Sequence, residues 1–278
     1  MIKTVAAMLI TFGFLLSSAN LAVAKEDTRQ IIATLTVQAA PYPLMTLTAE
    51  SGGTVLFLPF SSVGILAKRL LAQVTVPQSS QDARTLVVYA IPASFCTAKW
   101  QGVLFSIRQK MRCHRLLAVY QMPVRQAEDR QITAVDSRKI YTLANGFTLS
   151  LHPLQTADGK THVHTGLLRV SYRSFTIGLL LPTQMSPHPW PDDPDILILQ
   201  PSIFPHARDQ KLLDVLDPSA RIVLDEGSAK NTDTGALIER LREHWGDVYR
   251  VTKRNPLVLT IDLHHLILPM SRSQIVHS

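Results

Sequence analysis

Two kinds of hydrophobic periodicity alternate along this chain, and together they predict a mixed α/β fold. Alternation at every second residue, or a short apolar run, indicates a strand, whereas apolar residues three and four positions apart indicate an amphipathic helix. In the first half, helices are expected over 63–73 and 100–111. Strands are expected over 31–37, 44–47, 54–58, 86–89 and 116–120.

The middle of the chain predicts hairpins, and its final third returns to strands alternating with helices. Asn145-Gly146 separates two strand-like segments, 139–143 and 147–151, and such a dipeptide is typical of a tight hairpin turn. A second hairpin is expected from 165–172 and 175–181. Further on, the pattern predicts strands over 195–199, 221–224, 247–251 and 257–262, helices over 209–216 and 232–243, and no clear element over 264–278.

Strands therefore occur in two blocks, each interleaved with helices, and no change in composition marks a linker between the blocks. Two sheets packed face to face with helices outside fit this order of elements. We expect one large α/β domain over residues 25–263 and a tail over 264–278.

The first 24 residues have the features of a cleaved secretory signal. Lys3 precedes an apolar stretch from Val5 to Leu16, and Ala22-Val23-Ala24 supplies small residues for cleavage. Polar residues interrupt the apolar stretch too early for a retained membrane anchor, which needs about 20 apolar residues. We therefore expect a bacterial periplasmic or secreted protein without a membrane span after cleavage.

Composition adds a packed core and a basic charge to this expectation. Hydrophobic residues make up 46% of the chain and charged residues 18%, which excludes a disordered chain. The formal net charge of +7 favours anionic partners such as nucleic acid, phospholipid or acidic glycan, although many envelope proteins share it. The densest basic group follows a helical stretch and is expected to be solvated: Arg108, Lys110, Arg112 and Arg115.

The two cysteines, Cys96 and Cys113, leave the question of a disulfide open. A helix over 99–111 would be roughly 20 Å long, whereas bridged Cα atoms lie within about 7 Å. A helix that folds back near its own start would still allow the bridge.

Residues 86–104 form a hydrophobic strand, a sharp loop with Pro92 and a small-residue entry to a helix. This frame resembles the metallo-β-lactamase superfamily, where the loop carries His-x-His-x-Asp-His and holds two metals. The closer resemblance is to the C-terminal extracytoplasmic domain of ComEC-type DNA-internalisation proteins. Here the loop falls on Ile91 to Cys96, where only Cys96 retains a side chain able to bind metal. Likewise, Pro59-Phe60-Ser61 stands in place of the family's Asp-Thr-Gly.

The resemblance continues to the end of the domain, again without the motif residues. Gln184 stands near the family's bridging Asp, and Gln200-Pro201-Ser202-Ile203-Phe204 replaces Ser-His-His-Gly-Ser. Thr232 stands at the His that opens the family's late helix. The resemblance implies a four-layer αββα sandwich with a vestigial cleft, which the replacements Ile91, Phe95, Ile203 and Phe204 would make drier. The residues expected at that cleft are Pro92, Ser94, Cys96, Gln184, Gln200, Ser202, His206 and Thr232.

A zinc hydrolase needs at least three converging ligands and an open position for water. Because the family's ligands are replaced together, we assign no catalytic residue, no metal ligand and no cofactor. The favoured interpretation is a secreted pseudoenzyme of metallo-β-lactamase fold that binds a ligand or an envelope protein.

Two alternatives stay open. One is a phosphoesterase or nuclease with zinc or manganese at a relocated site, formed by His206 with His162, His164 or the cluster around Asp192. The other is a nucleic-acid-binding accessory of DNA uptake, which rests on the resemblance and the net charge. Trp100 and Trp190 could stack on a sugar or base, although Trp100 is expected to pack its helix onto the sheet.

Overall fold

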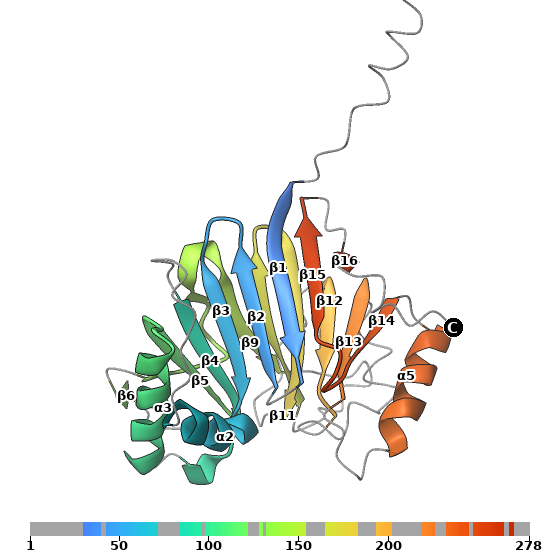
Figure 1. Cartoon of the computed structure of the whole chain (residues 1–278). Coiled ribbons are helices and arrows are strands. Elements are labelled where there is room, and N and C mark those ends of the chain that lie inside the picture. Colours follow the sequence, from blue (N-terminus) through green and yellow to red (C-terminus); the bar gives the residue numbers. More distant parts are fainter. Residues whose placement is uncertain are drawn as a thin grey trace, which may run out of the picture.

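The computed structural model describes the greater part of the chain after residue 29 and contains two mixed β-sheets with helices (Figure 1). The mixed α/β class expected from the sequence is confirmed. The described residues are 30–39, 43–71, 84–95, 98–121, 128–129, 132–153, 165–182, 193–201, 218–225, 232–244, 247–263 and 267–269.

The first sheet has nine strands in the order β16-β15-β1-β2-β3-β4-β5-β7-β6. Strands β3, β4, β5 and β7 run parallel, whereas β15, β1, β2 and β3 pair in antiparallel fashion. The carboxyl ends of the parallel strands therefore share one edge of the sheet. The strand bounds are β1 Ile31–Gln38, β2 Leu44–Ala49, β3 Thr54–Pro59, β4 Arg84–Ile91, β5 Arg115–Tyr120, β6 Glu128–Asp129, β7 Ile132–Ala134, β15 Leu257–Asp262 and β16 Ile267–Pro269.

The second sheet has seven strands in the order β14-β13-β12-β11-β10-β9-β8. It repeats the mixed pattern, because β11 to β14 are parallel and β8 to β11 are antiparallel. The strand bounds are β8 Tyr141–Thr142, β9 Thr148–Pro153, β10 Thr165–Tyr172, β11 Phe175–Pro182, β12 Ile196–Leu199, β13 Ala220–Leu224 and β14 Asp247–Val251.

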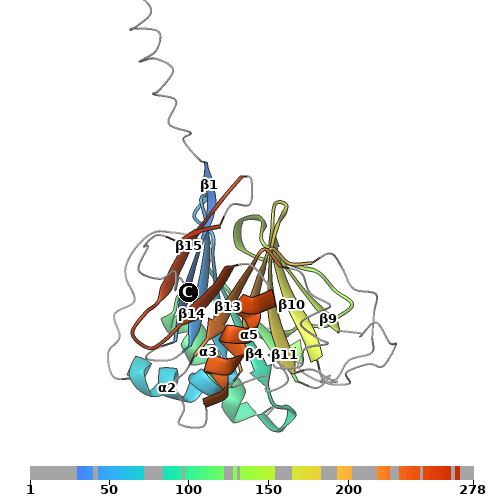
Figure 2. The same ribbon diagram turned by 90° about the vertical axis from the view of Figure 1, so that its right-hand side faces the viewer.

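Within the described residues, three separate apolar cores define the layers. The largest contains side chains of both sheets, such as Leu35, Phe57 and Leu168, so the sheets pack face to face. A second core lies between the first sheet and the helices α2 (Phe60–Leu71) and α3 (Ala98–Lys110). A third joins α5 (Thr232–His244) to the second sheet. Figures 1 and 2 show α2 and α3 beside strands β3 to β5 and α5 beside β13 and β14.

Short elements account for the differences from the sequence expectation. Strands β6 and β7 were not expected, and the expectation of no element over 264–278 is wrong, because β16 pairs with β15 there. Each has only two or three residues, too few to show alternation. The expected helix over 209–216 and the expected signal segment over 1–24 lie outside the described residues. Within the part of the chain described, no helix has the length and apolarity needed to cross a bilayer.

The turn before β9 ties the two sheets together at one edge. The expected two-residue hairpin turn is instead a short 3₁₀ turn, Ala144–Gly146, in which Asn145 and Gly146 adopt positive φ values of 49° and 86°. This backbone directs the Asn145 amide to the β2–β3 turn, where Nδ2 donates to the carbonyl of Ser51 at 3.0 Å. Gly53 makes the approach feasible, because a Cβ there would lie 2.5 Å from Asn145 Cβ.

Candidate functional site at the carboxyl edges of the sheets

At the opposite edge, the carboxyl ends of β4 and β12 are joined by one buried hydrogen bond. The Tyr89 hydroxyl donates to Gln200 Oε1 at 2.8 Å. Tyr89 is 1% exposed and Gln200 is fully buried. The bond links the strand before the Pro92 loop to the residue after β12, so the structure brings together the two segments where the sequence predicted a cleft.

A bulge at the end of β4 sets the direction of these side chains. Ala90 has a positive φ of 57°, and the pairing of β4 with β5 shifts register between Val88 and Ile91. As a result, Tyr89 and Ala90 both belong to the core between the sheets, whereas Ile91 belongs to the core under the helices.

The loop after β4 continues toward the helices. Phe95 N–H donates to the Pro92 carbonyl at 3.0 Å and closes a short 3₁₀ turn that leaves Ser94 exposed. The Phe95 ring packs 4.8 Å from Phe60 and 5.1 Å from Trp100. Ile91 and Phe95, which were expected to make the cleft drier, therefore pack with the core under the helices. The expected packing role of Trp100 is confirmed.

Asp225, directly after β13, supplies a carboxylate at the same edge of the second sheet. It is 8% exposed, and its Oδ2 accepts hydrogen bonds from Arg250 Nε at 3.1 Å and Nη2 at 2.5 Å. Sequence reasoning missed both Asp225 and Tyr89 as site residues. The signal for Asp225 was available, because a polar residue directly after a buried parallel strand lies at the edge where such folds place their sites.

The remaining predicted site residues divide into two groups. Thr232 is the first residue of α5. Cys96, Gln184, Ser202 and His206 lie outside the described residues, as do His162, His164, Trp190, Asp192, Ile203 and Phe204.

The side chains that the structure describes at the carboxyl edges of the two sheets do not form a set of ligands for two metals. A neutral phenol and a neutral amide bond each other, and the Asp225 carboxylate is held by a guanidinium. Metal centres in proteins use thiolates, imidazoles and carboxylates as ligands. Among the residues described, no group of three or more His, Cys, Asp and Glu side chains lies close enough to hold a metal ion.

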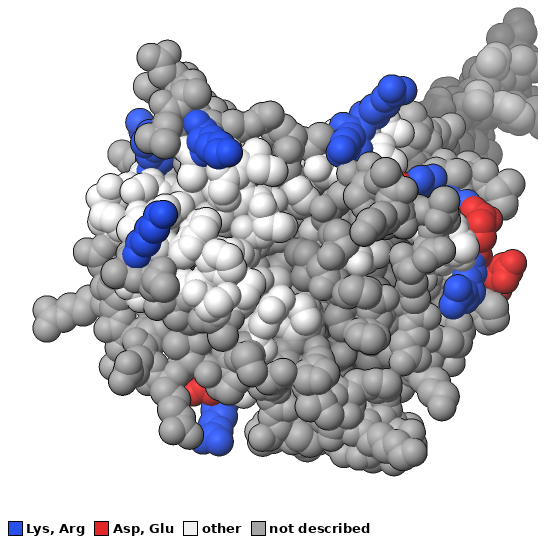
Figure 3. Space-filling view, turned by 90° about the horizontal axis from the view of Figure 1, so that it is seen from below, with Lys and Arg blue, Asp and Glu red and all other residues white. Residues whose placement is uncertain are grey.

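Two of the four clustered basic residues, Arg108 in the last turn of α3 and Arg115 at the start of β5, donate to backbone carbonyls. Arg108 donates to the carbonyls of Cys113 at 3.1 Å and His114 at 2.9 Å, which satisfies acceptors beyond the helix end. Arg115 donates to the Thr142 carbonyl at 2.7 Å. Figure 3 views the molecule from the carboxyl-edge side, and its Lys and Arg side chains stand at separate points around the rim.

Cys113 is a free, buried thiol, 6% exposed. Burial raises the pKa of this thiol from 9.0 to about 11, against the smaller opposing effect of Arg84 and Arg108. Burial, with a further contribution from Asp247, also raises the pKa of Tyr249 from 10.0 to about 12.

These two groups predict a loss of stability at alkaline pH. Each pKa is higher in the folded state than in the unfolded chain. The contribution of each group to the free energy of unfolding is therefore fully present below its unfolded pKa and is lost as pH rises toward its folded pKa, about 11 for Cys113 and about 12 for Tyr249. The loss from Cys113 is about 2–3 kcal/mol. Urea unfolding from pH 8 to 11 measures it, and Cys113→Ala should flatten the Cys113 part of the profile. An unchanged profile in that variant would contradict the assignment.

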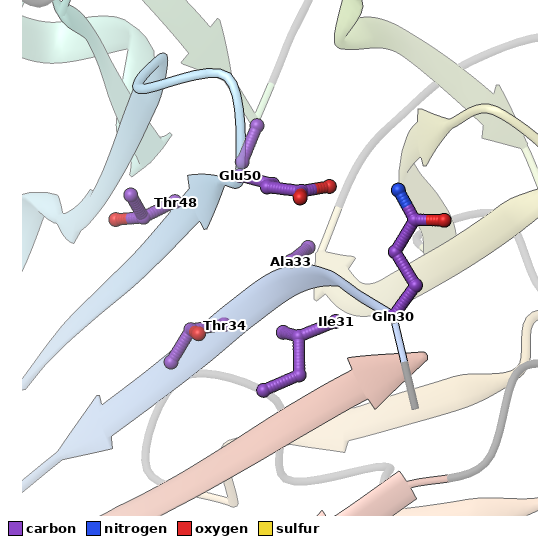
Figure 4. A pocket seen from close by; sticks show the side chains of 7 residues that line it. Gln30, Ile31, Ala33, Thr34, Thr48 and Glu50 are labelled. Atoms are coloured by element: carbon purple, nitrogen blue, oxygen red, sulfur yellow. The ribbon is translucent and has the colours of Figure 1, made fainter. Parts of the chain in front are cut away.

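A hollow of about 560 Å³ lies at the opposite edge of the first sheet, where β1 begins (Figure 4). The bulge between Ile31 and Ala33 interrupts pairing with β15 and leaves Ile31 44% exposed. Figure 4 shows the Glu50 carboxylate and the Gln30 amide pointing toward one another. Sequence reasoning missed this hollow because a bulge gives no periodic signal. Its lining is Gln30, Ile31, Ala33, Thr34, Thr48, Ala49 and Glu50.

No protein-family model matches the chain, and no curated protein matches it significantly.

Proposed function

We propose that this chain is a non-catalytic binding module on a metallo-β-lactamase-type fold, exported from a bacterial cell. The observation that carries the proposal is the buried hydrogen bond between Tyr89 and Gln200. It places a phenol and an amide, bonded to one another and buried, at the junction of the two carboxyl edges. A hydrolytic metal site needs charged or imidazole ligands and an open, wet position at that junction.

The arrangement of the sheets supports the choice of fold. Each sheet joins an antiparallel half to a parallel half, and both parallel halves direct their carboxyl ends to the edge where Tyr89 meets Gln200. Open parallel sheets hold ligands outside such edges. A fold of this kind can keep its core while its site changes role, because function depends on the site rather than on the fold.

The binding role is supported by the hollow at the start of β1. It combines apolar contacts from Ile31, Ala33 and Ala49 with a carboxylate and an amide at its rim. Binding sites commonly pair a mainly apolar lining with a few polar groups that orient the ligand. We therefore assign recognition to surfaces away from the carboxyl edges.

Elemental analysis of the purified protein tests the non-catalytic part of the proposal. The protein is dialysed against a weak chelator, reloaded with zinc and manganese, and dialysed again. We expect no stoichiometric metal and no hydrolysis of bis(p-nitrophenyl) phosphate above the buffer rate. One or two retained metals per chain would overturn the proposal in favour of a relocated phosphoesterase site, and His206→Ala would then show whether His206 is a ligand.

A further inference from the structure

Arginine, histidine and serine side chains cluster on the outer face of the second sheet, on strands β9 and β10. Neighbouring positions on β9 and β10, such as Leu151, Leu168 and Val170, point into the core between the sheets. Because side chains alternate along a strand, Ser150, His152, Arg169 and Ser171 all lie on the opposite, outer face.

The strand register places these groups next to one another. Arg169 stands directly opposite Ser150 in the antiparallel pair, where opposite Cβ atoms lie about 4.5–5.5 Å apart. His152 Nε2 lies 2.8 Å from Ser150 Oγ, within hydrogen-bond distance. Ser171 follows Arg169 on the same face, opposite Thr148.

On its other side, Arg169 stands opposite a residue without a side chain, Gly178 of β11. A Cβ at Gly178 would lie 2.7 Å from Leu167 Cδ1 and 3.0 Å from Pro194 Cγ. Apolar side chains therefore lie beside Arg169 on the β11 side. The polar neighbours of the Arg169 guanidinium come from β9 and β10.

Arg169 lacks a counter-charge within the part of the chain that the structure describes. Its Nε is buried and makes no hydrogen bond to any described group. The Asp195 carboxylate, directly before β12, is engaged by Thr176: its Oδ2 accepts from the backbone N–H at 2.7 Å and from Oγ1 at 3.1 Å. This arrangement is costly, because the buried Nε–H donor has lost water without gaining an acceptor.

We propose that Arg169, Ser150, Ser171 and His152 form a binding site for a phosphate group. The planar guanidinium offers two parallel N–H donors to a tetrahedral anion. The hydroxyls of Ser150 and Ser171 flank it and donate to the remaining oxygens. His152 is a positioning residue: when its Nε2 donates to Ser150 Oγ, the Ser150 hydroxyl proton is free to point at the anion. The site does not depend on the proposed function, since it lies on neither carboxyl edge.

Titration with inorganic phosphate, followed by isothermal calorimetry or by NMR of the arginine side chains, tests the site. We expect saturable binding that Arg169→Gln weakens about tenfold or more, as loss of a charge-assisted bond implies. Arg173→Gln is the matched control, because Arg173 is an exposed arginine on the turn after β10 and should leave binding unchanged. Ser150→Ala should weaken binding without removing the charge.

A second arm distinguishes the source of the phosphate. Phosphatidylglycerol and phosphatidylcholine vesicles are compared for binding of wild-type protein and Arg169→Gln. Binding to the anionic vesicles that is lost in the variant and displaced by free phosphate supports a lipid headgroup, and binding of free phosphate alone supports a soluble phosphomonoester. No phosphate binding by the wild type, or equal binding by a folded Arg169→Gln, would overturn the proposal.

Discussion

Replacement of Phe147 by Ala is expected to lower the free energy of unfolding by about 3–5 kcal/mol. Phe147 is fully buried in the core between the sheets, and its ring lies 4.6 Å from that of Tyr172. The variant loses the transfer free energy of the ring and leaves a cavity that two rigid sheets cannot collapse to fill. Its position is also fixed by the backbone, because the Phe147 carbonyl accepts from Leu143 N–H at 2.7 Å.

Urea unfolding monitored by circular dichroism measures the change, and calorimetry should show Tm lower by about 10 °C. The m-value should stay constant, since the surface exposed on unfolding hardly changes. Phe105→Ala is the matched control: Phe105 lies on α3, only partly buried, with Arg108 above its ring. Equal losses in the two variants would mean that Phe147 does not occupy the centre of the core.

The long elements of this fold follow from hydrophobic periodicity alone. Strand β11 and its partner β10 were predicted within a residue of their bounds, because short apolar runs on either side of a turn are typical of buried strands. The seven positions of β11 from Phe175 to Leu181 are indeed all buried, as in a strand covered on both faces. Helix α2 begins at Phe60, three positions before the expected start at Val63, because Phe60 packs against Phe95 and Trp100. Those partners lie far along the chain, so no local pattern reports them.

The candidate site was harder to predict for a related reason. Gln200 could be placed from the strand that precedes it, but its partner Tyr89 reads as one more apolar residue of a buried strand. The bulge at Ala90 decides which face Tyr89, Ile91 and Phe95 occupy, and a positive φ at an alanine leaves no trace in the sequence. The same holds for Arg169, whose neighbour Ser150 is set by register between strands rather than by spacing along one strand.

A single buried charge in place of Gln200 tests whether the Tyr89–Gln200 junction is dry or is open to water and ligands. Replacing Gln200 by Glu keeps the size of the side chain and its acceptor for the Tyr89 hydroxyl. At a position with no exposed surface, however, desolvation raises the pKa of a carboxyl above its unfolded value. Relative to the wild type, the variant should therefore be stable below the unfolded pKa of about 4.3 and lose stability as pH rises through the folded pKa.

At pH 8 the expected loss in Gln200→Glu is about 3–5 kcal/mol, the usual cost of an uncompensated buried charge. Gln200→Met is the control: it leaves the Tyr89 hydroxyl without this acceptor, at a cost of about 1–3 kcal/mol, and adds no group that titrates. Its deficit relative to the wild type should therefore stay constant between pH 5 and 8, as judged by urea unfolding at each pH. If Gln200→Glu is instead tolerated at pH 8, or is stabilised by added zinc, the junction is wet and accepts a ligand, and the dry, non-catalytic interpretation of this edge fails. A steep loss that is absent in Gln200→Met would show that the junction is dry and offers no compensating charge to a carboxylate, as the non-catalytic interpretation requires.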